Sequence, residues 1–396
     1  MESTAPTSQF GWKGVALGIL GISLVLRVLV YPVVVSDYTY FIKVWFSNLH
    51  DNGLAAFAQP FADYAPLYLY LLKLLSYIPV SSLYSAKTLS FIFDVLIAVA
   101  GYFILKRTVA WANRSDLLFL AAVTLLALPT VLINSSLWAQ SDALYTAGVV
   151  GSLFFMLVDA PLIASLLFGV AISFKLQAIF FSPILIGYLV RRRDTWPYLI
   201  VPPGVFFLTV LPAWFSGGSL SYWLFIYGAQ SSEYKYLSVS AQSIFAFLQP
   251  LPLTSTQTDL AFWAGLVAAG IVAILTVLLI ARLPQLTIRA LVTLSLASAL
   301  VIPYLLPRMH ERYFYLADII ATLYAWLRPD RWWVAAIVVS TSLMSYMPFL
   351  SGQVGFLTWA HVDLRVPAML LLIPISTVLY DVWNIWRAQK LLRIAL

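Results

Sequence analysis

The sequence contains no cysteine, so it has no disulfide, no thiolate nucleophile and no Cys-ligated metal site. Charge is also scarce. Asp, Glu, Lys and Arg make up 10% of the 396 residues, against about 25% in soluble domains. Hydrophobic residues make up 62% of the chain. A soluble protein of this composition could not cover its surface with polar groups. The sequence therefore predicts a single integral membrane domain over residues 1–396.

The formal net charge of +7 indicates a membrane surface better than nucleic acid, which we do not expect as a partner. Lys and Arg gather on the cytoplasmic side of membrane proteins, next to anionic membrane lipid. The 14 Trp and 22 Tyr are typical of membrane–water interfaces. No A-x-A-like cleavage site follows the first apolar run, so we expect that run to be retained as a span.

Apolar segments recur along the whole chain. A helical span needs roughly 20 apolar residues, and the sequence predicts an all-α polytopic membrane protein with about twelve transmembrane helices. The fifth and sixth segments are short and form a pair around Lys175. We find no internal repeat between the halves, whereas many transporters carry one. The segments are 12–32, 83–105, 116–133, 141–158, 160–173, 176–190, 196–216, 259–282, 288–306, 312–327, 332–350 and 366–386.

The basic residues divide unequally between the two sides that this order defines. Fourteen fall on one side and eight on the other, with Arg27 inside the first span. By the positive-inside rule the first side, which includes Arg191, Arg192 and Arg193, is cytoplasmic, and both termini lie there. We expect a multi-pass protein of the plasma (inner) membrane of a prokaryote.

Two connections on the opposite, outer side are long, 33–82 and 217–258. Long structured loops on one side favour a site on that side. In the first, Tyr38, Phe41, Trp45 and Leu49 form one apolar helical stripe, which predicts an interfacial helix. The apolar run 66–79 is too short for a span and is expected to be re-entrant or interfacial.

Ionisable residues cluster on this outer side, in Ser36–Tyr38, Asp63–Pro66, Phe174–Gln177 and Arg308–Phe314, with a further cluster at Trp138–Asp142. Ionisable groups at membrane depth are costly, so each needs a partner or a function. Glycosyl transfer from a lipid phosphate needs a carboxylate to accept the acceptor's proton. It also needs cations to stabilise the leaving phosphate. These cations make a metal unnecessary, and we expect no cofactor.

Each motif also has a structural interpretation. Asp37 could cap the following helix, and Asp63 could start a turn. Lys175 could reach to the interface, and the two arginines at 308 and 312 could bind lipid head groups. The case for function depends on their joint placement on one side.

The order Asp37, then D-Y-A-P, F-K-L-Q and H-E-R-Y-F, resembles the GT-C superfamily of membrane glycosyltransferases. It is most similar to the dolichyl-phosphate-sugar glucosyltransferases of the N-glycosylation pathway and their prokaryotic relatives, which carry D-Y-P-P, F-K-Q and H-E-K. Ala65 departs from that pattern. No W-W-D-Y-G element is present, which argues against an oligosaccharyltransferase. The H-E-R-Y-F loop also resembles that of mannosyltransferases, so glucose and mannose both stay open.

The resemblance implies an inverting hexosyltransferase that uses a polyprenyl-phosphate donor and acts on a glycan, lipid or protein acceptor. It implies that Asp37 is the general base and that the substrates bind other residues of these motifs. The substrate-binding candidates are Asp63, Tyr64, Gln140, Asp142, Lys175, Gln177, Arg308, His310, Glu311 and Arg312. The alternatives are a transporter or flippase for a lipid-linked sugar, and a structural or assembly subunit.

Overall fold

The described residues form helices and one two-stranded sheet. The computed structural model describes residues 11–108, 112–233, 236–354 and 362–395. Within these residues, seven helices are long and apolar enough to cross a membrane. They are α1 (Trp12–Val30), α4 (Ser82–Lys106), η5 with α10 (Arg193–Ile200 and Val201–Phe215), α14 (Ser255–Arg282), α15 (Ile288–Leu305), η6 with α17 (Pro329–Arg331 and Trp332–Leu350) and α18 (Arg365–Ala395).

The remaining predicted segments form bent or shorter apolar helices. A pair bent by 48° would make an eighth span. It joins α5 (Ser115–Leu126) to α6 and η3 (Pro129–Leu132 and Ile133–Leu137). The shorter helices are α7 (Asp142–Leu157), α8 (Pro161–Phe174), η4 with α9 (Leu176–Phe181 and Ser182–Val190) and α16 (Tyr315–Leu327). All twelve predicted segments are therefore helical, which confirms an all-α polytopic protein. The count of twelve spans is not confirmed.

The outer helices expose apolar side chains that only lipid can cover. On α14, Leu260, Trp263 and Val267 are 60% exposed or more. The central helices are buried instead, and α7 packs closely on α8. A Cβ added at Gly148 of α7 would lie 2.9 Å from the Leu167 carbonyl oxygen of α8, so glycine allows this approach. The bundle thus has a buried centre and a lipid-compatible periphery.

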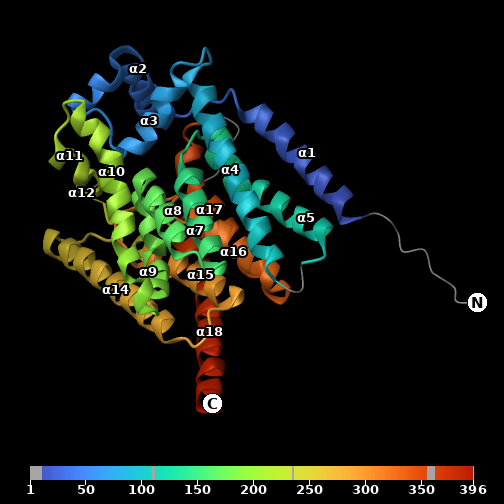
Figure 1. Cartoon of the computed structure of the whole chain (residues 1–396). Helices are drawn as coiled ribbons and strands as arrows, with labels where there is room; N and C mark the ends of the chain where they lie inside the picture. The colour runs from blue at the N-terminus through green and yellow to red at the C-terminus, as the bar shows by residue number, and fades with distance from the viewer. Residues whose placement is uncertain (1–10, 109–111, 234–235, 355–361, 396) are drawn as a thin grey trace, which may run out of the picture.

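Contacts between connections define the two ends of the bundle. At one end Arg192 pairs with Asp159, and Arg191 donates to the carbonyl oxygen of Leu283. These short connections belong to the basic side of the predicted topology. At the other end lie α2, α3 and α11, at the top of Figure 1, while the C-terminus extends beyond the basic end. The alternation of connections between two sides is therefore seen in the fold.

The segment predicted as the first outer loop is a compact helical layer. It holds η1 (Tyr38–Ile42), α2 (Lys43–Asn52), η2 (Gly53–Ala58) and α3 (Pro66–Leu75). The aromatic stripe predicted to lie on the membrane interface has a different partner. Trp45 and Leu49 are 5% and 0% exposed and belong to the main hydrophobic core. The stripe therefore packs inward against the protein, and the placement of this helix at the membrane interface stays a prediction.

The second long connection packs against the first. It holds α11 (Leu220–Leu224), α12 (Ile226–Glu233), β1 (Ser238–Val239) and α13 (Phe245–Leu248). Trp223 donates from Nε1 to the Phe57 carbonyl oxygen, and Tyr222 donates to that of Ala62. Strand β1 pairs in parallel with β2 (Met309–His310), with Val239 opposite His310. The two connections and the 308–314 motif therefore form one structured cap at this end.

Candidate active site

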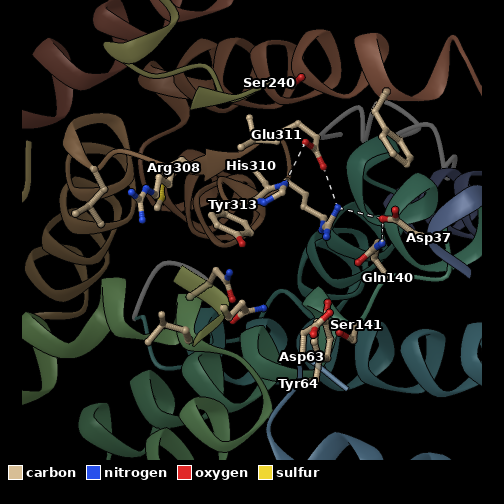
Figure 2. A pocket seen from close by; sticks show the side chains of 18 of the residues that line it. Asp37, Asp63, Tyr64, Gln140, Ser141, Ser240, Arg308, His310, Glu311 and Tyr313 are labelled. Carbon is tan, nitrogen blue, oxygen red and sulfur yellow. Dashed lines mark hydrogen bonds and ion pairs between the residues drawn. The ribbon is translucent and has the colours of Figure 1, made fainter. Parts of the chain in front are cut away.

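A cavity of about 720 Å³ lies under this cap. Asp37 comes from the start of the first connection, and Asp63 with Tyr64 precedes α3. Gln140 lies between η3 and α7, and the 308–313 segment lies between α15 and α16. In Figure 2, Asp37 and Arg308 lie at opposite ends of the view. His310 and Glu311 lie between them, facing Asp63 and Tyr64 across the cavity.

The Asp37 carboxylate is held through one of its two oxygens. Oδ2 accepts hydrogen bonds from Trp138 Nε1 at 3.0 Å and Gln140 Nε2 at 2.7 Å. It also accepts one from Arg312 Nη1 at 3.3 Å. Among the residues that the structure describes, none bonds to Oδ1. The carboxylate does not cap the following helix, because its side chain makes no capping hydrogen bond. Asp37 is thus fixed in position with one oxygen available to a ligand.

Irregular helical turns position this carboxylate and its donors. Asp37 is followed by the π-helical turn η1, and Trp138 is preceded by the π-helical turn η3. Pro129, at the start of α6, breaks the regular helix before η3 because it lacks an N–H donor. Such π turns are frequent at functional sites. Ala139, between the two donors, has φ +64°, a left-handed conformation that costs energy in a residue with a side chain.

Arg312 connects the carboxylates of the site. Its Nη1 also donates to Glu311 Oε1 at 2.9 Å, and its Nε lies 3.8 Å from Asp142 Oδ2. Asp142 is fully buried and pairs through Oδ1 with Lys175 Nζ at 2.6 Å. Buried charges need such partners, because an unpaired one is costly. The result is a chain of alternating charges that extends from the cavity into the protein core.

The loop that carries His310 is fixed by the small sheet. Arg308 donates from its backbone N–H to the Leu237 carbonyl oxygen at 2.8 Å. Arg308 and Ser240 both have φ +61°, so strained backbone lies on both sides of the strand pair. Burial lowers the pKa of His310 to about 3, with the nearby charges of Arg312 and Lys175 adding to the effect. His310 is therefore neutral near pH 7 and acts as a hydrogen-bonding group.

Glu311, beside His310, is 3% exposed. Burial raises the pKa of Glu311, while the charge of Arg312 works in the opposite direction. Glu311 lies beside His310 in Figure 2, with Oε2 at 3.8 Å from His310 Nδ1, and its Oε1 accepts a hydrogen bond from Arg312 Nη1 at 2.9 Å. Arg312 is therefore the partner that holds the charge of this carboxylate inside the protein.

The other half of the cavity is apolar. Its lining there comes from η4, from α14, from the end of α15 and from β2. The Arg308 guanidinium lies 4.4 Å from the ring centre of Phe262 on α14, which places a cation beside this apolar wall. The apolar lining residues are Ile179, Phe180, Phe262, Leu266, Leu306 and Met309. The cavity is therefore amphipathic, with charge at one end and hydrocarbon at the other.

Short helices set the depth of the polar end. Helix α16 has 13 residues and is about 20 Å long, against a hydrocarbon core of about 30 Å. Arg312 lies just before α16, Asp142 begins α7, and Lys175 ends α8. Each of these helices therefore ends in a charged residue of the site instead of continuing across the full bilayer thickness.

The sequence profile of glycosyltransferase family 87 matches residues 61–308, more than half of the chain. The chain belongs to glycosyltransferase family 87. A comparison with curated proteins gave no match. Membership supports the glycosyltransferase interpretation and gives no support to a transporter. The cavity lies partly inside and partly outside the matched segment, because Asp37 and the residues after Arg308 fall beyond it.

The family 87 chain brings most of the predicted site residues to one cavity. Those that line it are Asp37, Asp63, Tyr64, Gln140, Gln177, Arg308, His310, Glu311 and Arg312. Two do not: Lys175 and Asp142 lie behind the wall as a buried ion pair. Lys175 is paired with the carboxylate of Asp142 in this structure, and its contact with a substrate stays a prediction.

Several lining residues were not predicted as substrate-binding. Trp45 was assigned to the lipid interface, and Ser240 and Phe262 carry no local motif. The strand pair brings Ser240 next to His310, and that pairing joins segments about 70 residues apart. No short-range sequence pattern marks such a contact. Trp138 lay in a predicted cluster, but its role as a hydrogen-bond donor to Asp37 depends on the π turn.

Proposed function

We propose that this family 87 glycosyltransferase moves a hexose from a polyprenyl-phosphate donor to an acceptor hydroxyl with inversion, on the non-cytoplasmic side of the membrane. The observation that carries the proposal is the Asp37 carboxylate, which three donors hold through Oδ2 at the edge of a large cavity. Glucose and mannose are both candidates for the hexose. The acceptor is a glycan, a lipid or a protein.

The division of the cavity into polar and apolar halves supports a lipid-linked donor. A polyprenyl-phosphate sugar joins a polar head to a long hydrocarbon chain. The apolar wall includes Phe262 and Leu266 of α14, whose opposite face is exposed for lipid to cover. A hydrocarbon chain in this half would place its phosphate near Arg308, at the border with the polar half. The short central helices support a head group that lies below the membrane surface.

In the proposed reaction Asp37 acts as the general base. The acceptor hydroxyl gives its proton to Oδ1 of Asp37 while its oxygen forms a bond to the anomeric carbon. The bond between that carbon and the phosphate oxygen breaks, and polyprenyl phosphate leaves with the electron pair. The configuration inverts because the acceptor attacks the face opposite the leaving group.

Arg308 and Arg312 are the proposed cations for the leaving phosphate, and neutral His310 is a proposed hydrogen-bond donor to it. Arg312 holds Asp37 and Glu311 through the same guanidinium, so it links the base to the phosphate end. Lys175 has an indirect role in this scheme. It neutralises Asp142, which lies against Arg312, and thereby supports the position of the guanidinium.

The deciding experiment is a donor screen with purified protein in lipid nanodiscs. Polyprenyl phosphates carrying glucose, mannose or galactose are offered with a mixture of glycan, lipid and peptide acceptors. We expect a new glycosidic bond of inverted configuration from one donor. The same protein in sealed proteoliposomes supplies the transport assay, where movement of intact donor across the bilayer without bond formation would support a transporter instead.

Chelation tests whether the cations of the chain suffice. We expect transfer to continue in EDTA. Loss of activity that Mn²⁺ or Mg²⁺ restores would make the carboxylates of the cavity metal ligands. A separate test addresses sidedness with reporter fusions, which should read cytoplasmic after Arg193 and external near Ser231. The opposite pattern would place Asp37 in the cytoplasm and contradict the proposed location.

A further inference from the structure

Two polar side chains of the cavity carry oxygen atoms that have no hydrogen-bond partner among the described residues. Asp63 is half-buried, and it makes no hydrogen bond or ion pair with any residue in the described ranges. Gln177 is 3% exposed and lines the cavity, and its Oε1 atom is buried without a partner in the same ranges. A buried polar atom without a partner costs stability. A carboxylate and an amide without partners, on two residues that line one cavity, offer a ligand hydrogen-bond acceptors.

Asp63 and Gln177 belong to one wall. Asp63 adjoins Tyr64, whose ring centre lies 5.3 Å from Lys175 Nζ, and Lys175 is two residues before Gln177. Tyr64 also packs against Trp45, with ring centres 5.1 Å apart, and both rings line the cavity. Figure 2 shows Asp63 and Tyr64 across the cavity from His310 and Glu311. Asp63, Gln177, Tyr64 and Trp45 form this wall of the cavity.

The chemistry of the wall selects the class of ligand group. A carboxylate and an amide oxygen both accept hydrogen bonds, so they bind groups that donate hydrogen bonds, such as hydroxyls. A phosphate would be repelled by Asp63 and belongs on the side of Arg308. Aromatic rings next to the two acceptors offer a surface for the apolar face of a flat ring. Several hydroxyls on a ring with an apolar face describe a hexose.

The place of the wall points to the sugar that is transferred. In an inverting displacement the base and the leaving group lie on opposite sides of the anomeric carbon. Asp37 and Arg308 lie at opposite ends of the view in Figure 2, and Asp63 and Tyr64 of the wall lie across the cavity from His310 and Glu311, which lie between those ends. We propose that Asp63 and Gln177 bind hydroxyls of the transferred hexose and determine which sugar is accepted. This inference rests on the proposed function and adds the residues that read the donor sugar.

The test combines deoxy donors with single variants. Polyprenyl phosphates carry the accepted hexose or its 2-, 3-, 4- or 6-deoxy analogue, and kcat/KM is measured for wild type, Asp63→Asn and Gln177→Met. Removing the hydroxyl bound by Asp63 should cost wild type about 10–100-fold, the scale of a hydrogen bond to a charged group. The same removal should cost Asp63→Asn less than about threefold. Gln177→Met should lose sensitivity to a different hydroxyl, with a smaller factor.

Asp51→Asn is the matched control, since Asp51 is exposed on α2 and outside the cavity. It should keep the wild-type pattern for every deoxy donor. Asp63→Asn and Gln177→Met would overturn the inference if they slowed all donors by one common factor, because neither residue would then read a particular hydroxyl.

A binding arm separates this inference from the proposed function. Equilibrium binding of the same donors is measured on Asp37→Asn protein, alone and combined with Asp63→Asn or Gln177→Met. If wild type transfers no sugar but binding still depends on one hydroxyl through Asp63, the proposed function fails and the hexose subsite stands. If binding is the same for all analogues and all variants, the subsite is wrong whether or not transfer occurs.

Discussion

Two buried charge clusters of this protein use similar residues for different ends. The central cluster joins Arg27 of α1 to Asp94 of α4 at 2.9 Å. Both carboxylate oxygens of Asp94 accept hydrogen bonds. Oδ2 accepts from Arg27 and Ser135, and Oδ1 accepts from the Tyr315 hydroxyl. The cavity cluster joins Asp37, Glu311, Arg312, Asp142 and Lys175. In the cavity cluster, Oδ2 is the one oxygen of Asp37 that accepts hydrogen bonds from described residues.

The difference agrees with a structural role for Asp94 and with the proposed role of Asp37 as the base. Asp94 lies in the middle of a long helix and lines no described cavity, so its bonds join α1, α4, η3 and α16. Arg27 also donates to the Leu126 carbonyl oxygen, which the break before Pro129 leaves at a helix end. This bond ties α1 to the bend that leads to Trp138. The central cluster joins helices of the scaffold, and the cavity cluster leaves one oxygen of Asp37 for the proposed chemistry.

The largest expected effect is the loss of rate in Asp37→Asn. Asparagine keeps the shape of the side chain but cannot accept a proton. Loss of a general base typically lowers the rate by about 10²–10⁴-fold. Thermal unfolding in detergent and donor binding should stay close to wild type. Transfer at the wild-type rate would remove Asp37 from the proposed role, and a dead Asp63→Asn beside it would exchange the roles of the two carboxylates.

Asp94→Asn should show the opposite pattern. It leaves Arg27 buried without its charged partner, and breaking a buried ion pair costs about 3–5 kcal/mol of unfolding free energy. The surviving folded protein should transfer sugar at nearly the wild-type rate per molecule. Stability is measured by thermal unfolding, and rate is measured on the monodisperse fraction.

The double variant Arg27→Met/Asp94→Leu sharpens this test. Replacing both charges by apolar groups of similar size should recover much of the lost stability. If Asp94→Asn instead kept full stability and lost its rate, Asp94 would belong with Asp37 among the reactive groups and the comparison would fail.

Much of the scaffold and of the site could be predicted from sequence. Long apolar runs specify helices whatever covers them, so each predicted segment is helical. The motifs around Asp37, Asp63 and His310 meet because connections on one side of a bundle meet at one end. The aromatic stripe with Trp45 shows the limit of this reasoning. Periodicity identifies an apolar face but does not distinguish lipid from protein as its partner.

The long-range pairs were beyond the reach of local patterns. Asp142 and Lys175 are 33 residues apart, and Asp37 and Arg312 are 275 apart. A buried cation can interact with lipid, phosphate or a carboxylate, and only packing decides which. The π turns η1 and η3 likewise depend on tertiary contacts, because their residues carry no signal that separates a π turn from a regular helix.

Arg312→Gln should have a moderate effect on the cavity cluster. The change removes the guanidinium that holds Asp37 and Glu311 and that is proposed to contact the phosphate. A hydrogen bond between charged groups contributes about 1.5–3 kcal/mol, so kcat/KM for the donor should fall roughly 10–100-fold. Arg312→Lys should recover only part, because an ammonium cannot reproduce the planar fork. Arg365→Gln, at an exposed arginine, is the control and should change neither value. Full activity in Arg312→Gln would remove the phosphate role.

The smallest expected effect concerns His310 and pH. The pKa of His310 lies at about 3 in the folded protein, against 6.5 for an ordinary histidine, so the unfolded chain binds a proton that the folded protein does not. Stability should therefore fall as pH decreases from about 6.5 toward 3. His310→Gln removes this contribution, so the variant should lose less stability than wild type between pH 7 and pH 4. His50→Gln, on the exposed face of α2, should behave as wild type. Thermal unfolding across this range measures the difference.

In transfer assays between pH 5 and pH 8, His310→Gln should leave the shape of the pH–rate profile unchanged, because His310 is neutral throughout this range. An acid limb centred near pH 6.5 that disappears in His310→Gln would instead show that His310 titrates in the working enzyme, as a cation on the phosphate would.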